Sequence, residues 1–119
     1  MDYFKTDTKI DHIEMDISFN YKNKYWHIKI SQEINMFNSR NMRSEIMRAV
    51  QKKDADVVIN CKRVTYMDSG ALNAFVLLSK SMHYKNKRIS VEDLSPSIEK
   101  LFRIANLNSI LKIDKNNRQ

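Results

Sequence analysis

Residues 57–72 read VVINCKRVTYMDSGAL, and this stretch decides the fold. Its first five residues form an apolar run, which is typical of a central strand buried on both faces of a parallel sheet. Its last residues lead through Asp68 into a helical pattern that begins at Ser69. A strand followed directly by a helix is the repeating unit of α/β domains, so this stretch predicts that class.

The residues before position 57 predict a β-hairpin and then a helix. Two stretches alternate apolar and polar residues, the period of half-buried strands, and a polar turn at 20–24 joins them. Their apolar positions are Ile13, Met15, Ile17, Phe19, Trp26, Ile28 and Ile30. From Ser39 the period becomes helical, and Asn38 or Ser39 is suited to cap the helix. Its apolar face comprises Met42, Ile46, Ala49 and Val50.

The residues after position 69 predict two more helices around a short strand. The first helix has an apolar stripe at Ala71, Phe75, Leu78 and Met82, and a strand follows at 88–91. Ser95 and Pro96 open the next helix as cap and first residue, and Asn106 is a left-handed stop. The buried stripe of that helix is predicted at Ile98, Leu101, Phe102 and Ala105, before an edge strand near 110–113.

The element order is therefore β-β-α-β-α-β-α with a final edge strand. Alternation of this kind predicts a mostly parallel central sheet that is entered by a β-hairpin and has helices packed on it. Residues 1–119 are expected to form a single domain, whose core covers about 13–113.

Composition excludes several classes of protein. Gly70 is the only glycine, so neither a Walker loop nor a dinucleotide-binding fingerprint can be built. No apolar run approaches the roughly 18 residues of a membrane span, and the first residues lack the pattern of a signal peptide. We therefore expect a cytoplasmic protein without direct membrane insertion. The net charge of +7 is spread over small groups without interleaved aromatics, which favours a solvated surface or an acidic protein partner over direct binding of nucleic acid.

Catalytic and metal-binding patterns are not found in the sequence. Ser69 is not flanked as Gly-x-Ser-x-Gly, and the three histidines, at 12, 27 and 83, belong to no catalytic constellation. Asp54 and Asp56 alone do not make a metal site. Cys61 is the only cysteine and closes an apolar run, where it is expected to act as a small buried hydrophobe. We therefore expect no enzymatic activity, no catalytic residue and no metal.

Ser69 allows two interpretations from physical chemistry alone. Asp68 or Ser69 can simply cap the helix, as these residue types often do. Alternatively, Ser69 can accept a phosphate, because the dipole and unpaired N–H groups of a helix start stabilise an anion.

The segment 64–72, VTYMDSGAL, resembles the signature of the STAS family, the bacterial anti-sigma factor antagonists. The resemblance extends over the element order from about residue 13 to 113. It implies that Ser69 is phosphorylated by a partner serine kinase, which is also the anti-sigma factor and brings its own ATP, so the chain needs no cofactor. The unphosphorylated protein would bind this partner and the phosphorylated one would release it, which regulates sigma-factor-dependent transcription. A serine phosphatase would restore the first state.

The resemblance also implies which residues surround Ser69. The switch neighbourhood is expected to consist of Asp68, Gly70, Asn35, Thr65 and Met67. Residues 32–35, QEIN, match a family segment that usually ends in an acidic residue, so Asn35 keeps the shape of that residue without its charge. The expected partner-binding residues are Glu33, Asn35, Ser39, Ala71, Asn73 and Leu77.

Two other functions are compatible with the same fold. One is a cytoplasmic STAS subunit of an ABC-type membrane transporter, which binds the transporter ATPase without phosphorylation. The other is a scaffold in a signalling assembly, which predicts a stable homo-oligomer.

Overall fold

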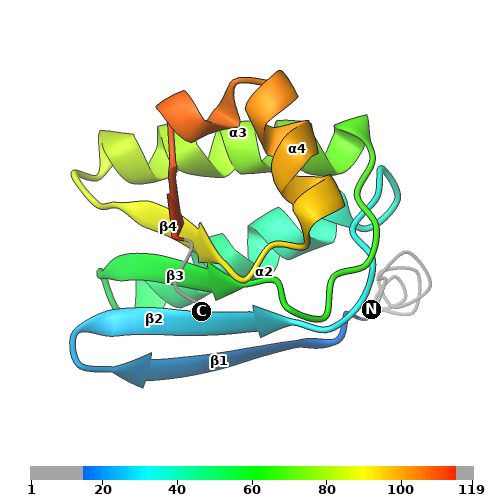
Figure 1. The fold of residues 1–119 in the computed structure, drawn as a ribbon. Helices are drawn as coiled ribbons and strands as arrows, with labels where there is room; N and C mark the ends of the chain where they lie inside the picture. Colours follow the sequence, from blue (N-terminus) through cyan, green and yellow to red (C-terminus); the bar gives the residue numbers. More distant parts are fainter. Residues whose placement is uncertain (1–14, 115–119) are drawn as a thin grey trace, which may run out of the picture.

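The structure, a computed structural model, describes residues 15–114. Strands β1 (Ile17–Lys22) and β2 (Tyr25–Ile30) pair in an antiparallel hairpin (Figure 1). The two residues between them, Asn23 and Lys24, both have positive φ angles, of 54° and 70°. Positive φ at both central residues suits the right-handed twist of the strands, so this short loop fixes the hairpin register. Ile13, predicted to belong to β1, lies outside the described residues.

The hairpin leads into parallel strands that alternate with helices. The following elements are α2 (Ser39–Lys52), β3 (Asp56–Asn60), α3 (Ser69–Tyr84), β4 (Ile89–Glu92), α4 (Pro96–Ile104), the 3-10 helix η1 (Leu107–Ser109) and β5 (Lys112–Asp114). Within the described residues the sheet has five strands in the order β1-β2-β3-β4-β5. The pairs β2–β3, β3–β4 and β4–β5 are parallel. The predicted element order is confirmed, and so is the edge strand.

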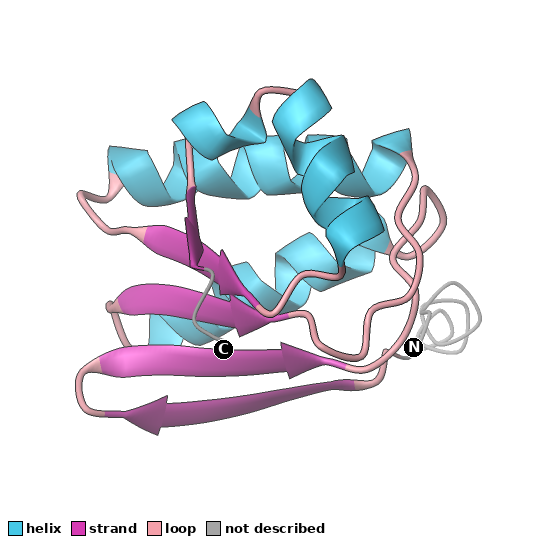
Figure 2. Ribbon diagram, in the orientation of Figure 1, coloured by secondary structure: helices cyan, strands magenta, loops and turns pink. Residues whose placement is uncertain are grey.

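The helices cover one face of the sheet (Figure 2), and the core lies on that face. In β3, Val57 and Ile59 are buried together with the apolar faces of the helices, whereas Val58 and Asn60 on the opposite face are only half-buried. The prediction that this strand is buried on both faces is therefore wrong. The sheet order follows the chain order from β2 to β5, so every crossover moves to the next strand on the same side. Because such crossovers are right-handed, all the helices then pack on one face of the sheet.

The helices begin and end largely as expected. The predicted core residues of α2 and α3 are buried. In α4 the Ser95 side chain accepts a hydrogen bond from the Ile98 N–H at 3.3 Å, and Asn106 adopts the left-handed conformation that stops the chain after the helix. The predicted stripe of α4 is too wide, because Leu101 and Ala105 are exposed. A helix of nine residues that ends at Ile104 buries only a narrow face, here Ile98 and Phe102.

None of the helices within residues 15–114 combines the length and the apolar character that crossing a membrane requires.

Candidate functional site at the start of helix α3

Two loops lie side by side at the start of α3. The N–H of Ile34, in the loop after β2, donates to the Tyr66 carbonyl at 3.0 Å. Ile34 also forms an isolated parallel bridge with Met67, and both side chains are buried. The core therefore holds the loop at 31–38 against the loop at 61–68, although the two are remote in sequence.

Asp68 links these two loops through its carboxylate. It is the N-cap of α3, and its Oδ1 accepts a hydrogen bond from the Ala71 N–H at 3.0 Å. Its Oδ2 accepts a second bond from the Met36 N–H at 2.9 Å. The pKa of Asp68 lies below its ordinary value, first because of the Ala71 N–H and then because of the Met36 N–H. Asp68 is therefore a charged carboxylate at neutral pH.

Gly70 allows the closest approach between the two segments. A Cβ atom at this position would lie 2.7 Å from the Cα of Met36 and 2.8 Å from its Cβ. Both of these atoms belong to a turn whose backbone is hydrogen-bonded, so it cannot move aside easily. The only glycine of the chain therefore stands where a second backbone passes over the helix.

Asn35 and Asn38 build the turn that crosses this helix start. The Asn35 Oδ1 accepts hydrogen bonds from the N–H groups of Phe37 at 2.8 Å and Asn38 at 3.1 Å. Its Nδ2 donates to the Glu33 carboxylate at 2.7 Å. In turn, the Oδ1 of Asn38 accepts a hydrogen bond from the Asn35 N–H at 2.9 Å. An aspartate at position 35 would lack the amide donor to Glu33, which gives a structural reason for asparagine here.

Asn38 occupies the N-cap position of α2 but does not cap it with its side chain. Its side-chain oxygen is taken by Asn35, and its Nδ2 donates to the Glu33 carbonyl at 3.0 Å. The predicted capping role of Asn38 is thus replaced by a role in the turn.

Ser69 is the first residue of α3 and is exposed. Large apolar side chains close to it are exposed as well: Met36 by 65%, Phe37 by 75% and Tyr66 by 52%. We call Met36, Phe37 and Tyr66 the apolar rim. The sequence analysis missed it, although a signal was present, because Met36 and Phe37 interrupt an otherwise polar segment between a strand and a helix. Exposed apolar side chains in two neighbouring loops are typical of an interaction surface.

The residues predicted for the switch neighbourhood lie in three kinds of environment. Asp68, Gly70 and Asn35 come together through the turn, as described above. Thr65 is exposed in the loop before α3, and Met67 is part of the core. The Met67 side chain therefore anchors the loop to the core and is not available to a partner.

The predicted partner-binding residues are divided between surface and core. Glu33 and Asn73 are exposed, and Asn35 and Leu77 are half-buried. Ser39 and Ala71 are buried, with 8% and 0% exposure, which corrects the prediction that they contact a partner. Ser39 lies on the inward side of the first turn of α2, and Ala71 belongs to the core stripe of α3.

Away from this site, Glu92 and Asp93 both accept hydrogen bonds from the Asn60 amide, at 3.1 and 2.8 Å. His27 and His83 are exposed in different elements, and Asp54 pairs with Lys85 and Lys87 at the surface. Within residues 15–114 there is no group of three or more His, Cys, Asp or Glu side chains that could hold a metal ion. The start of α3 is thus the candidate site on which the residues converge.

The chain belongs to the STAS domain family, because the family model matches residues 19–119. It is 22% identical over 103 residues to an anti-sigma-B factor antagonist of Staphylococcus aureus, which covers 87% of this chain and 95% of that protein. Among solved structures it is similar to a candidate anti-sigma factor antagonist of Thermotoga maritima, with a TM-score of 0.77, 18% identity and coverage of 84% and 87% of the two chains. The Bacillus protein SpoIIAA in its phosphorylated form superposes with a TM-score of 0.64 at 16% identity, covering 84% of this chain and 92% of that one.

Proposed function

We propose that this protein is an anti-sigma factor antagonist that acts by binding. When Ser69 is unphosphorylated, it binds an anti-sigma factor that is also a serine kinase, and it releases this partner when Ser69 carries a phosphate. The kinase supplies the ATP, and a serine phosphatase reverses the modification. The observation that carries the proposal is the exposed Ser69 at the start of a long helix, beside the apolar rim.

The position of Ser69 suits a phosphate in the free protein. The first N–H groups of a helix and its dipole favour negative charge, and α3 is a helix of 16 residues. A kinase can reach the hydroxyl because the side chain is exposed. The phosphorylated protein can therefore keep its fold.

The same phosphate is unfavourable within a complex. It adds a charge of about −1.5 to −2 at neutral pH, next to the carboxylate of Asp68. A docked partner surface would have to remove water from this pair of negative charges, which costs binding free energy. Each 1.4 kcal/mol of that cost lowers the affinity about tenfold. Release of the partner thus needs no large change of structure.

The apolar rim supports the binding step. The backbone around Met36 and Phe37 is held in place by Asp68, Asn35 and Asn38, so little conformational freedom is lost on docking. Exposed aromatic side chains in a rigid setting are frequent anchors of protein interfaces. We therefore place the partner on the apolar rim, with Ser69 covered by it.

The test is a capture experiment from the host lysate with four baits. The wild type is compared with Ser69→Asp, with Phe37→Ala and with Ser44→Asp, which places the same charge at an exposed serine on α2. The captured proteins are identified by mass spectrometry, and the captured fraction is incubated with ATP and fresh wild type to find the phosphorylated residue.

The proposal predicts that the wild type and Ser44→Asp retain an ATP-binding serine kinase, and that Ser69→Asp and Phe37→Ala lose it. It also predicts phosphate on Ser69 after incubation with ATP. If all four baits retain a transporter ATPase, the protein is a transporter subunit and the proposal is wrong. Capture of the same kinase by Ser69→Asp as by the wild type would equally refute the phosphorylation switch.

A further inference from the structure

Strand β1 forms an edge of the sheet to which no other strand of residues 15–114 is paired. The sheet order is β1-β2-β3-β4-β5, so β1 has β2 on one side and a free edge on the other. Its six residues pair with β2 in an unbroken register, and none of them is proline. A regular edge of this length is a template for pairing with another strand, and most proteins shorten, bend or cover such an edge.

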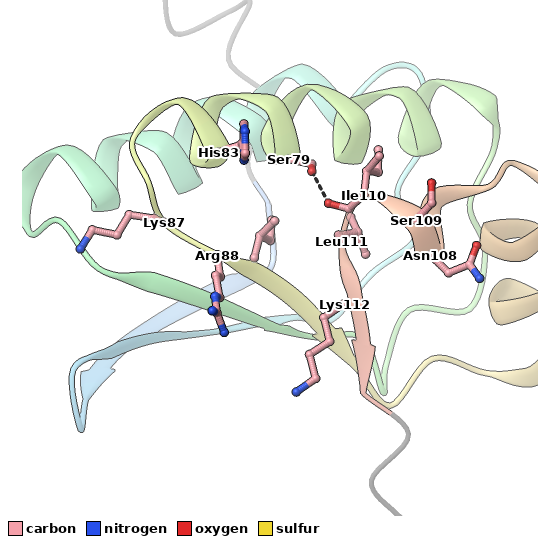
Figure 3. Close-up of a pocket in the computed structure, with 10 residues that line it drawn as sticks. Ser79, His83, Lys87, Arg88, Asn108, Ser109, Ile110, Leu111 and Lys112 are labelled. Atoms are coloured by element: carbon pink, nitrogen blue, oxygen red, sulfur yellow. Dashed lines mark hydrogen bonds between the residues drawn. The ribbon is translucent and has the colours of Figure 1, made fainter.

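The opposite edge of the sheet is protected in a way that β1 is not. Strand β5 has only three residues, and very short edge strands are a common protection against pairing. The segment before β5 is also fastened to α3, because the Ser79 hydroxyl donates to the Ile110 carbonyl at 2.6 Å (Figure 3). The edge that can accept a further strand is therefore the free edge of β1.

The backbone groups at this free edge belong to alternate residues of β1. The Asp16 carbonyl accepts a hydrogen bond from the Ser31 N–H at 2.9 Å, so the backbone of Asp16 faces β2. In an antiparallel pair both backbone groups of one residue point to the same side, and successive residues alternate. The N–H and carbonyl groups of Ile17, Phe19 and Tyr21 therefore point away from β2, to the free edge.

The side chains of these three residues carry the apolar core out to the same edge. Ile17 and Phe19 are half-buried against the core, and Tyr21 is 39% exposed. The Trp26 ring of β2 contacts both aromatic side chains edge-on, with centroid distances of 6.3 Å to Phe19 and 5.4 Å to Tyr21. Its indole N–H donates to the Lys53 carbonyl at 2.8 Å, which fixes the ring. An apolar strip in a fixed arrangement thus runs along the free edge.

The sequence of this edge is complementary to itself. Residues 16–22 read DISFNYK, with one acidic residue at the start and one basic residue at the end. Both Asp16 and Lys22 are exposed, and neither forms an ion pair with another residue of the described part of the chain. When two copies run antiparallel about a two-fold axis at Phe19, each Asp16 lies opposite Lys22 of the other copy. Opposite charges in such cross-strand positions stabilise the pairing.

The same register satisfies the backbone at the free edge. It places Ile17 opposite Tyr21 of the other copy, and Phe19 opposite Phe19. These are the three residues whose backbone groups point outward, so each N–H and carbonyl gains a hydrogen-bond partner. The two Phe19 side chains then meet on the face that carries the core, where aromatic cross-strand pairs are favourable.

We propose that β1 is a homodimer interface, in which two copies of this chain pair antiparallel about a two-fold axis at Phe19. The two five-stranded sheets then form one continuous sheet with all the helices on the same face. A second copy is the occupant that fits, because the charges and the apolar strip of the edge match themselves in one register. Only one strand from each copy takes part, so the dimer is weak and its population depends on concentration.

The test is sedimentation equilibrium of the purified, unphosphorylated full chain, at concentrations from micromolar to about 1 mM. The variants are Asp16→Lys and Lys22→Asp, each of which places like charges opposite one another in the homodimer. Lys80→Asp, at an exposed position of α3, is the matched control for the change of charge. The wild type, each variant alone and an equimolar mixture of the first two variants are compared, and thermal unfolding verifies the fold of each protein.

We expect a reversible monomer–dimer equilibrium in the wild type and in Lys80→Asp. The affinity should fall about tenfold in Asp16→Lys and in Lys22→Asp, because two attractive pairs become repulsive in each. The equimolar mixture should recover it, because each introduced charge then faces an opposite charge in the heterodimer. A wild type that stays monomeric up to about 1 mM would overturn the proposal, as would a mixture that associates no better than its components.

This measurement uses neither an anti-sigma factor nor a phosphate on Ser69. A monomeric wild type that still captures the kinase would refute the dimer alone. A dimer that captures no kinase would refute the proposed function alone.

Discussion

Asp68 holds Met36 in place across 32 positions of sequence, through the 2.9 Å hydrogen bond between its Oδ2 and the Met36 N–H. The same carboxylate caps α3 through Ala71. One side chain thus connects the helix that begins with Ser69 to the turn that presents the apolar rim. The position of the turn relative to the helix start thus depends in part on one charged side chain.

This dependence predicts an acid-sensitive site. The pKa of Asp68 is lowered in the folded protein, so its contribution to stability is complete above the unfolded-state pKa, about 3.9, and is lost as the pH falls below it. Asp68→Asn keeps a cap oxygen but does not titrate. The free energy of unfolding, measured with urea at pH 7 and pH 3, should therefore fall more in the wild type than in Asp68→Asn. An equal fall in both proteins would show that Asp68 does not carry this effect.

Gly70→Ala should destabilise the protein, although alanine is the better helix former. The added Cβ would lie 2.7 Å from the Met36 Cα, which demands a shift of the turn. Overpacking of this kind costs about 1–3 kcal/mol, against a gain in helix propensity of about 1 kcal/mol. Urea unfolding should show a net loss, whereas Asn73→Ala, at an exposed position of the same helix, should be neutral or slightly stabilising. A Gly70→Ala variant as stable as the wild type would mean that the turn can move aside.

Local pattern predicted most of the fold because each element carries its own period and end signals. The buried positions of α2 and α3 and the cap at Ser95 follow from side chains close in sequence. The half-buried outer face of β3 cannot be predicted in this way, because it depends on all the helices packing on the other face of the sheet. The same limit applies to Leu101, whose exposure reflects how little of a short helix the neighbouring elements cover.

The sequence predicts where the candidate site lies, but it does not predict the long-range contacts that build it. Ser69 and Asp68 stand out in the sequence because a strand, an acidic residue and a helix start meet there. The contact of Gly70 with Met36 joins residues that are far apart in the chain, so no local pattern reveals it. For the same reason the burial of Ser39 does not follow from the sequence, whereas the burial of Ala71 follows from the helical period of α3 and contradicts the partner contact that the resemblance implies.

Cys61 should be unreactive in the native protein. Burial, followed by the charges of Asp93 and Glu92, raises its pKa to about 12, so almost no thiolate exists at pH 8. We expect no reaction with Ellman's reagent in buffer and full reaction in denaturing urea. A Ser44→Cys variant, which adds an exposed thiol, is the control and should react with one equivalent in buffer. Rapid labelling of the native wild type would contradict the buried position of Cys61.

Phosphorylation of Ser69 should loosen the turn at Met36. A phosphate at the first residue of α3 competes with Asp68 for the N–H groups of the helix start and repels its carboxylate. The hydrogen bond from the Met36 N–H to Asp68 is exposed, whereas the bond from the Ala71 N–H is partly buried, so we expect the Met36 bond to weaken first. With phosphoserine incorporated at position 69 during translation, the amide of Met36 should exchange with solvent several-fold faster, as measured by NMR. Phosphoserine at position 44 is the matched control and should leave this amide unchanged. An unchanged Met36 amide in the protein phosphorylated at Ser69 would mean that the phosphate acts on a partner through its own charge alone, and not through the turn.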